Sequence, residues 1–266
     1  MSELLVASKQ EPGDDGSVLK VSPESAGWEY VGFEVLRLAD GRTLERRADG
    51  EEVCLVLLSG YCTVSTGNDE WRGIGERDSV FEGPPYAVYL PPGTDYRVEA
   101  VTYLELAVCS APAQRGEKPL LIRPEDIEVE VRGKGNMERR IHQILMEDRP
   151  AERLLVVEVL TPNGHYSSYP PHKHDREDPP RERYLEETYY HRIQPVQGFA
   201  LQRVYTEDRS LDETLAFRDG DAVLVPRGYH VVSAPPGYDL YYLNVMAGPV
   251  REWRIKNDPD HEWLLG

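Results

Sequence analysis

The feature that most constrains the fold of this sequence is a pattern of short apolar segments and tight turns that occurs twice along the chain. In the first half, a glutamate pair at 51–52 precedes an apolar segment, and Pro-Pro-Gly follows at 91–93. In the second half, a glutamate pair at 186–187 precedes a similar segment, and Pro-Arg-Gly follows at 226–228. The repeated order indicates an internal duplication, so we expect two domains of one fold.

The apolar segments are short and rich in β-branched and aromatic residues, and glycines and prolines separate them. This pattern is typical of strands in an all-β sandwich or barrel. The clearest expected strands are residues 53–58, 86–90, 103–109, 154–160, 188–193, 199–205, 222–225 and 240–246.

At 266 residues the chain is long enough to bury two cores. We expect an arm over residues 1–27, because that stretch is polar, a first β domain over 28–120 and a second over 121–266. The basic segment 132–142 is expected to be a loop leading into the second domain, and its arginines could border a functional site.

Histidines in the second half have the spacing of metal ligands. His172 and His174 are two residues apart, so in an extended strand their side chains point to the same face. Pro226 fixes its own φ and Gly228 permits a tight turn, so the chain can reverse just before His230. We therefore expect three imidazoles to converge on one ion.

A carboxylate would complete this ligand set, and Glu186 and Glu187 are the two candidates. Alternation along a strand places Glu187, Tyr189 and His191 on one face, which favours Glu187. Three nitrogens and one oxygen suit borderline divalent ions such as zinc, manganese, iron(II), cobalt or nickel. The first copy has no His-x-His, and Asp95 stands where His230 stands, so we expect no metal site there.

The charge and cysteine content of the chain restrict its partners and its compartment. The formal net charge is −17, which argues against binding to nucleic acid or to anionic membrane surfaces. Cys54, Cys62 and Cys109 are scattered and odd in number, so we expect free thiols and a reducing compartment. The sequence has no apolar stretch long enough to span a membrane and no secretory signal pattern, so we predict a cytoplasmic protein.

The expected ligands also resemble the two motifs of the cupin family. His172 and His174 with a following glutamate resemble the first motif, and residues 220–230 resemble the second. The gap between the second histidine and the glutamate is longer than usual, and the final turn has one residue rather than two before its histidine. The first departure leaves the choice between Glu186 and Glu187 open.

Three longer runs, residues 164–175, 184–193 and 238–248, resemble the 5-deoxy-glucuronate isomerases of myo-inositol catabolism. That family is related to the 5-keto-4-deoxyuronate isomerases of pectin breakdown. The resemblance covers nearly the whole chain and implies a bicupin, with two tandem double-stranded β-helix (jelly-roll) barrels, that assembles as a homo-oligomer. We expect one divalent metal ion per chain, zinc in the first place, with manganese or iron as alternatives.

The resemblance implies an aldose–ketose isomerase that converts 5-deoxy-D-glucuronate to 2-deoxy-5-keto-D-gluconate. A bound cation would stabilise the enediolate, and a side chain would carry the proton between the two carbons. His191, Tyr189 and Tyr242 are the candidate catalytic residues, and both an enediol route and a hydride shift stay open. Competing functions are a 5-keto-4-deoxyuronate isomerase, a cupin-type iron dioxygenase and a non-catalytic sugar-binding cupin.

The expected substrate is a small anionic sugar acid, and its carboxylate needs a cationic partner. Arg203 and Arg192, near the metal segment, and Lys173, between the two histidines, are candidates, and His165 is a further candidate contact. The polar insert 175–183 is expected to be either a lid over the site or a solvent-exposed loop.

Overall fold

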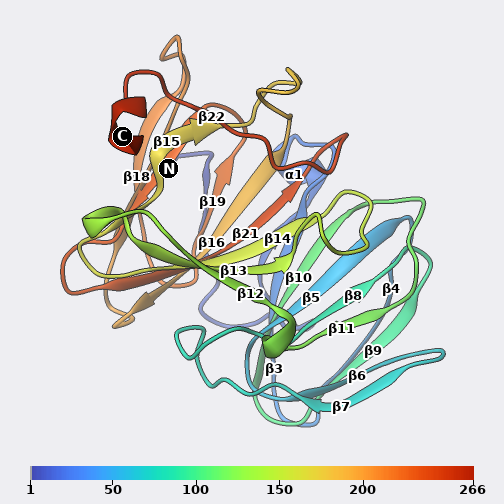
Figure 1. Cartoon of the computed structure of the whole chain (residues 1–266). Coiled ribbons are helices and arrows are strands. Elements are labelled where there is room, and N and C mark those ends of the chain that lie inside the picture. Colours follow the sequence, from blue (N-terminus) through green and yellow to red (C-terminus); the bar gives the residue numbers. More distant parts are fainter. Residues whose placement is uncertain (1) are drawn as a thin grey trace. The chain divides into compact units, whose positions relative to one another are not determined.

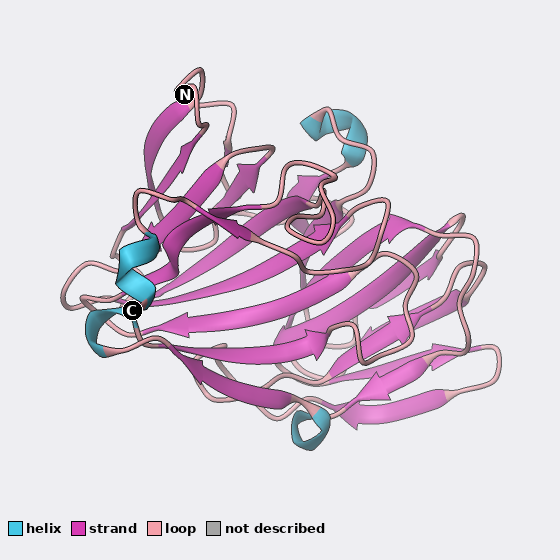
Figure 2. Cartoon of the chain, turned by 45° about the horizontal axis from the view of Figure 1, so that its top comes forward, coloured by secondary structure: helices cyan, strands magenta, loops and turns pink. Residues whose placement is uncertain are grey.

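The computed structural model describes residues 2–266, and most of them belong to antiparallel strands (Figures 1 and 2). The described residues form one short α-helix, α1 (Pro23–Ala26), and three 3-10 turns, η1 (Pro124–Asp126), η2 (Gly135–Met137) and η3 (Glu262–Leu265). The predicted all-β fold is confirmed.

The chain divides into two compact units, which differ from the expected domains at their boundaries. The C-terminal unit contains residues 2–8, Val129–Gln143 and Val157–Gly266, and the N-terminal unit contains Lys9–Glu128 and Ile144–Val156. The expected arm over 1–27 includes two strands, β1 (Leu5–Val6) and β2 (Ser17–Val21). The apolar side chains of β2 are buried, which explains why this stretch packs instead of extending into solvent.

Two sheets lie mainly in the C-terminal unit. The larger has the strand order β1-β19-β16-β21-β14-β13-β12, and the smaller has the order β18-β17-β20-β15-β22. The strands are β12 (Glu128–Arg132), β13 (Arg139–Leu145), β14 (Leu155–Thr161), β15 (Tyr166–Lys173), β16 (Glu186–Gln194), β17 (Ala200–Tyr205), β18 (Asp212–Phe217), β19 (Ala222–Val225), β20 (Tyr229–Ser233), β21 (Asp239–Ala247) and β22 (Lys256–Asn257).

The N-terminal unit also consists of two sheets, with the strand orders β11-β8-β5-β10-β3-β2 and β4-β9-β6-β7. Its core contains apolar side chains of both sheets, among them Leu55, Val64 and Leu106. The remaining strands are β3 (Gly32–Leu38), β4 (Thr43–Arg47), β5 (Glu51–Ser59), β6 (Cys62–Thr66), β7 (Glu70–Ile74), β8 (Ala87–Leu90), β9 (Asp95–Ala100), β10 (Leu104–Pro112) and β11 (Leu120–Ile122).

Strand pairing in the smaller sheet of the C-terminal unit brings two of the expected ligands together. In the antiparallel pair β15 and β20, His172 lies directly opposite His230. Gly228, just before β20, has φ 88°, and a Cβ atom there would lie 2.4 Å from the carbonyl oxygen of Tyr205. Only glycine fits this turn without strain, so Gly228 fixes the point at which β20 begins.

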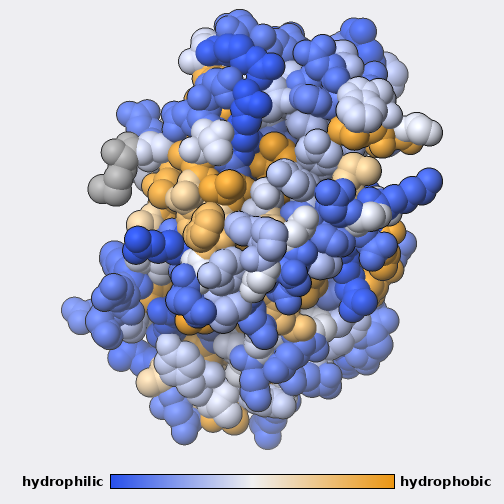
Figure 3. All heavy atoms as spheres, turned by 90° about the vertical axis from the view of Figure 1, so that its left-hand side faces the viewer, coloured by the Kyte–Doolittle hydropathy of each residue, from blue (hydrophilic) through white to orange (hydrophobic). Residues whose placement is uncertain are grey.

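The surface is largely polar, in keeping with the net charge of −17. On the face that Figure 3 shows, hydrophilic atoms predominate and hydrophobic atoms gather in a smaller area. None of the helices in residues 2–266 has the length and apolar character needed to cross a membrane.

Candidate metal centre

Three histidines form a compact cluster in the C-terminal unit. His172 lies near the end of β15, His174 follows that strand, and His230 is the second residue of β20. One ring nitrogen of each lies within 4.8 Å of the others, and all three side chains are buried. The predicted alternation and turn thus bring these imidazoles together, and a set of this kind could hold a metal ion.

Glu187, on β16 of the larger sheet, supplies the carboxylate beside this cluster. Its Oε2 atom lies 3.1 Å from the Nε2 atom of His174 and 3.1 Å from that of His230. Glu186 instead directs Oε1 to the hydroxyl group of Tyr184, at 3.4 Å. The structure therefore brings Glu187, and not Glu186, to the histidines, as strand alternation suggested.

The backbone fixes which nitrogen of two histidines faces Glu187. Nδ1 of His174 donates to the carbonyl oxygen of Leu185 at 3.0 Å, and Nδ1 of His230 donates to that of Gly228 at 3.3 Å. A ring that is neutral then directs the lone pair of Nε2 toward the carboxylate. Facing lone pairs at this distance repel unless a proton or a cation lies between them, so the donor set fits a divalent ion.

The pKa values of His172 and Glu187 are lowered, whereas that of His174 is raised. Burial alone would lower the pKa of His174, but its hydrogen bond to Glu187 outweighs burial. Burial, together with the charges of His230 and His174, holds the pKa of His172 well below its usual value. Burial alone would raise the pKa of Glu187, but His230 and His174 outweigh it and hold that pKa below its usual range. Metal binding requires neutral imidazoles, so a bound ion would replace the proton that Glu187 favours on His174.

A cavity of about 430 Å³ adjoins the cluster, and His172 and Glu187 form part of its wall. This volume is within the range of small-molecule sites. Further lining residues are Ser168, Tyr189, Tyr242, Asn244 and Trp253, together with the cations Arg132, Lys134 and Arg139.

Two of the three candidate catalytic residues lie at this cavity. The hydroxyl group of Ser168 lies 2.9 Å from that of Tyr189 and 3.4 Å from that of Tyr242. Burial raises the pKa values of both phenols, and the charge of Glu187 raises that of Tyr189 further. Both phenols therefore keep their protons at neutral pH and can donate hydrogen bonds to a ligand.

His191, the third candidate, does not line the cavity. Its Nε2 atom donates to Oε1 of Gln202 at 3.0 Å, and its ring stacks on Phe217 at a centroid distance of 3.7 Å. Burial lowers its pKa to about 3. His191 is therefore a fully buried, neutral imidazole of the core. The expectation that it lies at the site with Tyr189 and Tyr242 is corrected.

None of the four candidate substrate contacts lines the cavity, and each has a partner close to it in the structure. Arg203 pairs with Asp212 across β17 and β18, at 2.8 and 2.9 Å, and Arg192 pairs with Asp219 at 2.9 Å. His165 donates from Nδ1 to the carbonyl oxygen of Glu138 at 2.8 Å. Neither these three residues nor Lys173 lines the cavity.

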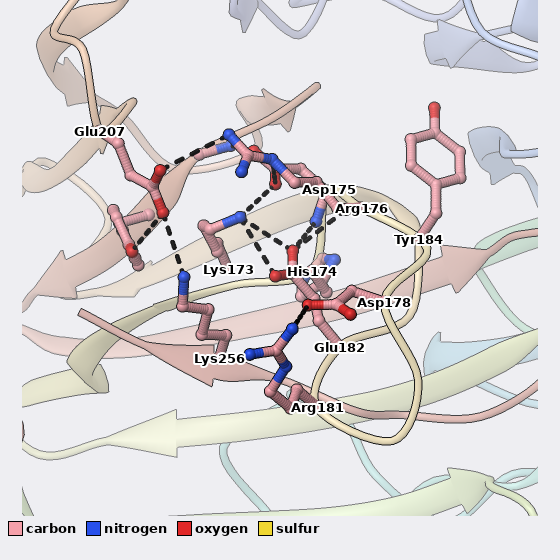
Figure 4. Close-up of polar contacts among 12 residues, drawn as sticks. Lys173, His174, Asp175, Arg176, Asp178, Arg181, Glu182, Tyr184, Glu207 and Lys256 are labelled. Carbon is pink, nitrogen blue, oxygen red and sulfur yellow. Dashed lines mark hydrogen bonds and ion pairs between the residues drawn. The ribbon is translucent and has the colours of Figure 1, made fainter. Parts of the chain in front are cut away.

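Lys173 instead anchors the insert 175–183 (Figure 4). Its ammonium group lies 3.0 and 3.1 Å from the two carboxylate oxygens of Glu182, and both residues are 1% exposed. It also donates to Asp175 at 2.6 Å, and Asp175 accepts the backbone N–H of Gly228 at 2.7 Å. The insert is thus tied to β15 and to the turn before His230.

The arginines of the basic segment 132–142 were expected only as a group that could border a functional site. The structure places Arg132 and Arg139 at the cavity, within the C-terminal unit. In the sequence, Arg139 is a basic residue at the start of an apolar segment. Such a pattern does not show which cavity the strand borders.

Distant structural neighbours share the fold. Oxalate decarboxylase from Bacillus subtilis, a protein with Mn(II) centres, has a TM-score of 0.63 and 13% sequence identity, over 97% of this chain and 80% of that one. At such low identity the likeness concerns the fold alone. With the paired sheets of each unit, it confirms the expected cupin fold.

Closer relatives identify the family. A 5-deoxy-glucuronate isomerase from Geobacillus thermodenitrificans is 58% identical over 266 residues, which span 100% of this chain and 97% of the relative. The crystal structure of an IolB-like protein from Salmonella typhimurium LT2 has a TM-score of 0.97 and 49% identity, with 100% of both chains covered. Residues 4–264 match the model of the KduI/IolB family. This chain therefore belongs to the KduI/IolB family.

Proposed function

We propose that this chain is a metal-dependent aldose–ketose isomerase that converts 5-deoxy-D-glucuronate to 2-deoxy-5-keto-D-gluconate. The observation that carries the proposal is the position of His172, a member of the histidine cluster, and of Glu187 beside that cluster, because both also line a cavity. Relatives named 5-deoxy-glucuronate isomerase are 44–58% identical to the chain.

We propose that His172, His174, His230 and Glu187 hold one divalent ion, and zinc is our first expectation. Three imidazole nitrogens and one carboxylate oxygen also accept manganese or iron(II). Such an ion would stabilise the negative charge that develops on the substrate oxygen.

The reaction leaves the formula of the sugar acid unchanged. The C2–H and O2–H bonds break, C1–H and O1–H bonds form, and the carbonyl group moves from C1 to C2 through an enediolate. Tyr189 and Tyr242 line the cavity with protonated phenols, which supports a role as hydrogen-bond donors to the reacting oxygens. Ser168 contacts both phenols and would hold them in place.

A proton NMR time course in deuterated water tests the proposal. The metal-loaded protein should convert 5-deoxy-D-glucuronate to the ketose, and a chelator should stop the conversion. Deuterium in the new hydroxymethyl group would support proton transfer through an enediol, and its absence would support a hydride shift. No conversion, or preferred turnover of 5-keto-4-deoxyuronate, would contradict the proposed substrate, and oxygen uptake would indicate a dioxygenase.

We propose that the N-terminal unit has no metal site and that the protein forms a homo-oligomer. Within residues 2–266 the cluster of three histidines lies in the C-terminal unit. Asp95, the counterpart of His230 in the repeat, is exposed and pairs with Arg47 at 2.7 Å. Metal analysis per chain and sedimentation equilibrium test the two statements.

We also propose that the protein works in the cytoplasm. Cys54, Cys62 and Cys109 are buried free thiols. Thiols of this kind are typical of a reducing compartment. Fractionation of cells that produce the protein tests this location.

A further inference from the structure

Arg139 has an unusual environment for a charged side chain. It is the first residue of β13, it is 8% exposed, and it lines the same cavity as His172 and Glu187. Its Nη1 atom donates to the carbonyl oxygen of Met137 at 3.1 Å. Among residues 2–266, no carboxylate lies within ion-pair distance of its guanidinium group.

A buried guanidinium group with one acceptor leaves most of its five donors unused. Burial lowers the pKa of Arg139, which reflects how unfavourable its charge is without a partner. Glu130, whose charge acts on Arg139, does not neutralise it, because both of its carboxylate oxygens pair with Arg132, at 2.9 and 2.7 Å. Glu138, the adjacent residue in the sequence, is exposed.

The charge balance of the cavity points the same way. Basic side chains outnumber acidic side chains in its wall, with Arg132, Lys134 and Arg139 against Glu187, although Arg132 pairs with Glu130 and Gly266 also lines the cavity. Basic side chains in the wall of a cavity attract anionic ligands.

We propose that Arg139 binds the carboxylate group of the substrate through two parallel hydrogen bonds, while the aldehyde end faces His172 and Glu187. A planar guanidinium group suits such bidentate binding, and a ligand carboxylate would supply the acceptors that the protein does not. The inference deepens the proposed function and rests on it for the identity of the aldehyde end. Arg139 thereby selects sugar acids over neutral sugars.

The test compares Arg139→Gln with Arg140→Gln, an exposed neighbour that loses the same charge. KM for 5-deoxy-D-glucuronate should rise about 100-fold in the Arg139 variant, since hydrogen bonds to charged groups are among the strongest in proteins. Arg139→Lys should recover part of this loss. The Arg140 variant should match the wild type, and all three variants should retain the metal.

Binding of an unreactive ligand separates this inference from the proposed function. Reduction of the substrate aldehyde gives a sugar acid that cannot isomerise, and calorimetry with its carboxylate and carboxamide forms isolates the charge. The wild type should prefer the carboxylate form, and Arg139→Gln should bind both forms equally. Equal affinity of the wild type and Arg139→Gln for the carboxylate form would show that Arg139 does not bind the carboxylate group. This conclusion would hold whether or not the wild type isomerises the substrate.

The stability of the ligand-free protein distinguishes an anchor from a structural arginine. Replacement of a structural arginine should lower the melting temperature, whereas removal of an unpaired buried charge should not. We expect Arg139→Met to melt at the wild-type temperature or above and to lose the stabilisation by the reduced sugar acid. A clear drop in melting temperature together with unchanged ligand stabilisation would contradict the proposal.

Discussion

The Nε2 atom of His230 lies 3.1 Å from the Oε2 atom of Glu187, although β20 and β16 belong to different sheets of the C-terminal unit. His172 and His174 come from β15 and its end, next to β20. The candidate centre therefore forms only when the two sheets pack on each other, and metal binding should stabilise that packing.

Replacement of His230 by alanine tests the ligand set. The variant should bind the ion more than about 100-fold more weakly, because even changes outside the ligand shell cost 10- to 100-fold. Titration of the apoprotein with the metal measures the affinity. Asp95→Ala is the control, since Asp95 is exposed in the N-terminal unit. Loss of the metal in the Asp95 variant alone would mean that the site lies in the N-terminal unit, contrary to the proposal.

Gly228→Ala tests the turn that positions His230. The added Cβ atom would lie 2.4 Å from the carbonyl oxygen of Tyr205, at a φ of 88°, so we expect a loss of about 1–3 kcal/mol and weaker metal binding. Gly237→Ala is a matched control with φ 91° and no atom within 4 Å of the new Cβ. Urea denaturation should show a smaller loss there, about 1 kcal/mol, and no change in metal affinity.

Glu182→Gln tests the anchor of the insert. Removal of one partner from a buried ion pair costs about 3–5 kcal/mol, and here it leaves the ammonium group of Lys173 with Asp175 alone. The exposed pair of Arg181 and Asp178 provides the comparison, where Arg181→Ala should cost less than about 1 kcal/mol. Similar losses in both variants, measured by urea denaturation, would contradict a structural role for the buried pair.

The buried neutral ring of His191 predicts a pH dependence of stability. Its pKa is about 3 in the folded protein and 6.5 in a model peptide, so between these values the unfolded chain binds a proton that the folded protein does not. The contribution is complete above pH 6.5 and falls with decreasing pH, by up to about 1.4 kcal/mol per pH unit.

Urea denaturation of the metal-free protein checks this slope without interference from metal loss. The difference in unfolding free energy between the wild type and His191→Gln should be constant above pH 7 and shrink toward pH 4. A difference that does not change with pH would mean that His191 titrates normally.

The sequence predicted the fold and the convergence of the ligands because both depend on local rules. Alternation along a strand groups His172 with His174, and a Pro-x-Gly turn directs His230. That these residues bind a metal is the proposal. The substrate contacts were not predictable in this way, because the partners of Arg203 and Arg192 are acidic residues that only the folded neighbourhood reveals.

Arg139 shows the same limit from the other side. It lies on β13, and all of β14 separates it from β15, which carries the first proposed ligand, His172. Nothing in its local pattern shows that β13 borders the cavity. The long insert after His174 also left the glutamate open between Glu186 and Glu187. Alternation favoured Glu187, and the distances of its carboxylate to His174 and His230 agree.

Tyr189→Phe tests the phenol that lines the cavity two residues after Glu187 on β16. Loss of a hydrogen-bond donor to the developing oxyanion should lower kcat by about 100-fold, with little change in KM, because the bond strengthens in the transition state. Metal content should stay at the wild-type level, since the phenol is not among the proposed ligands. Tyr190→Phe is the control, because alternation points Tyr190 to the opposite face of β16, away from the cavity lining. Equal kcat values for the wild type and Tyr189→Phe would remove Tyr189 from the reaction and leave Tyr242 as the phenol that contacts the substrate.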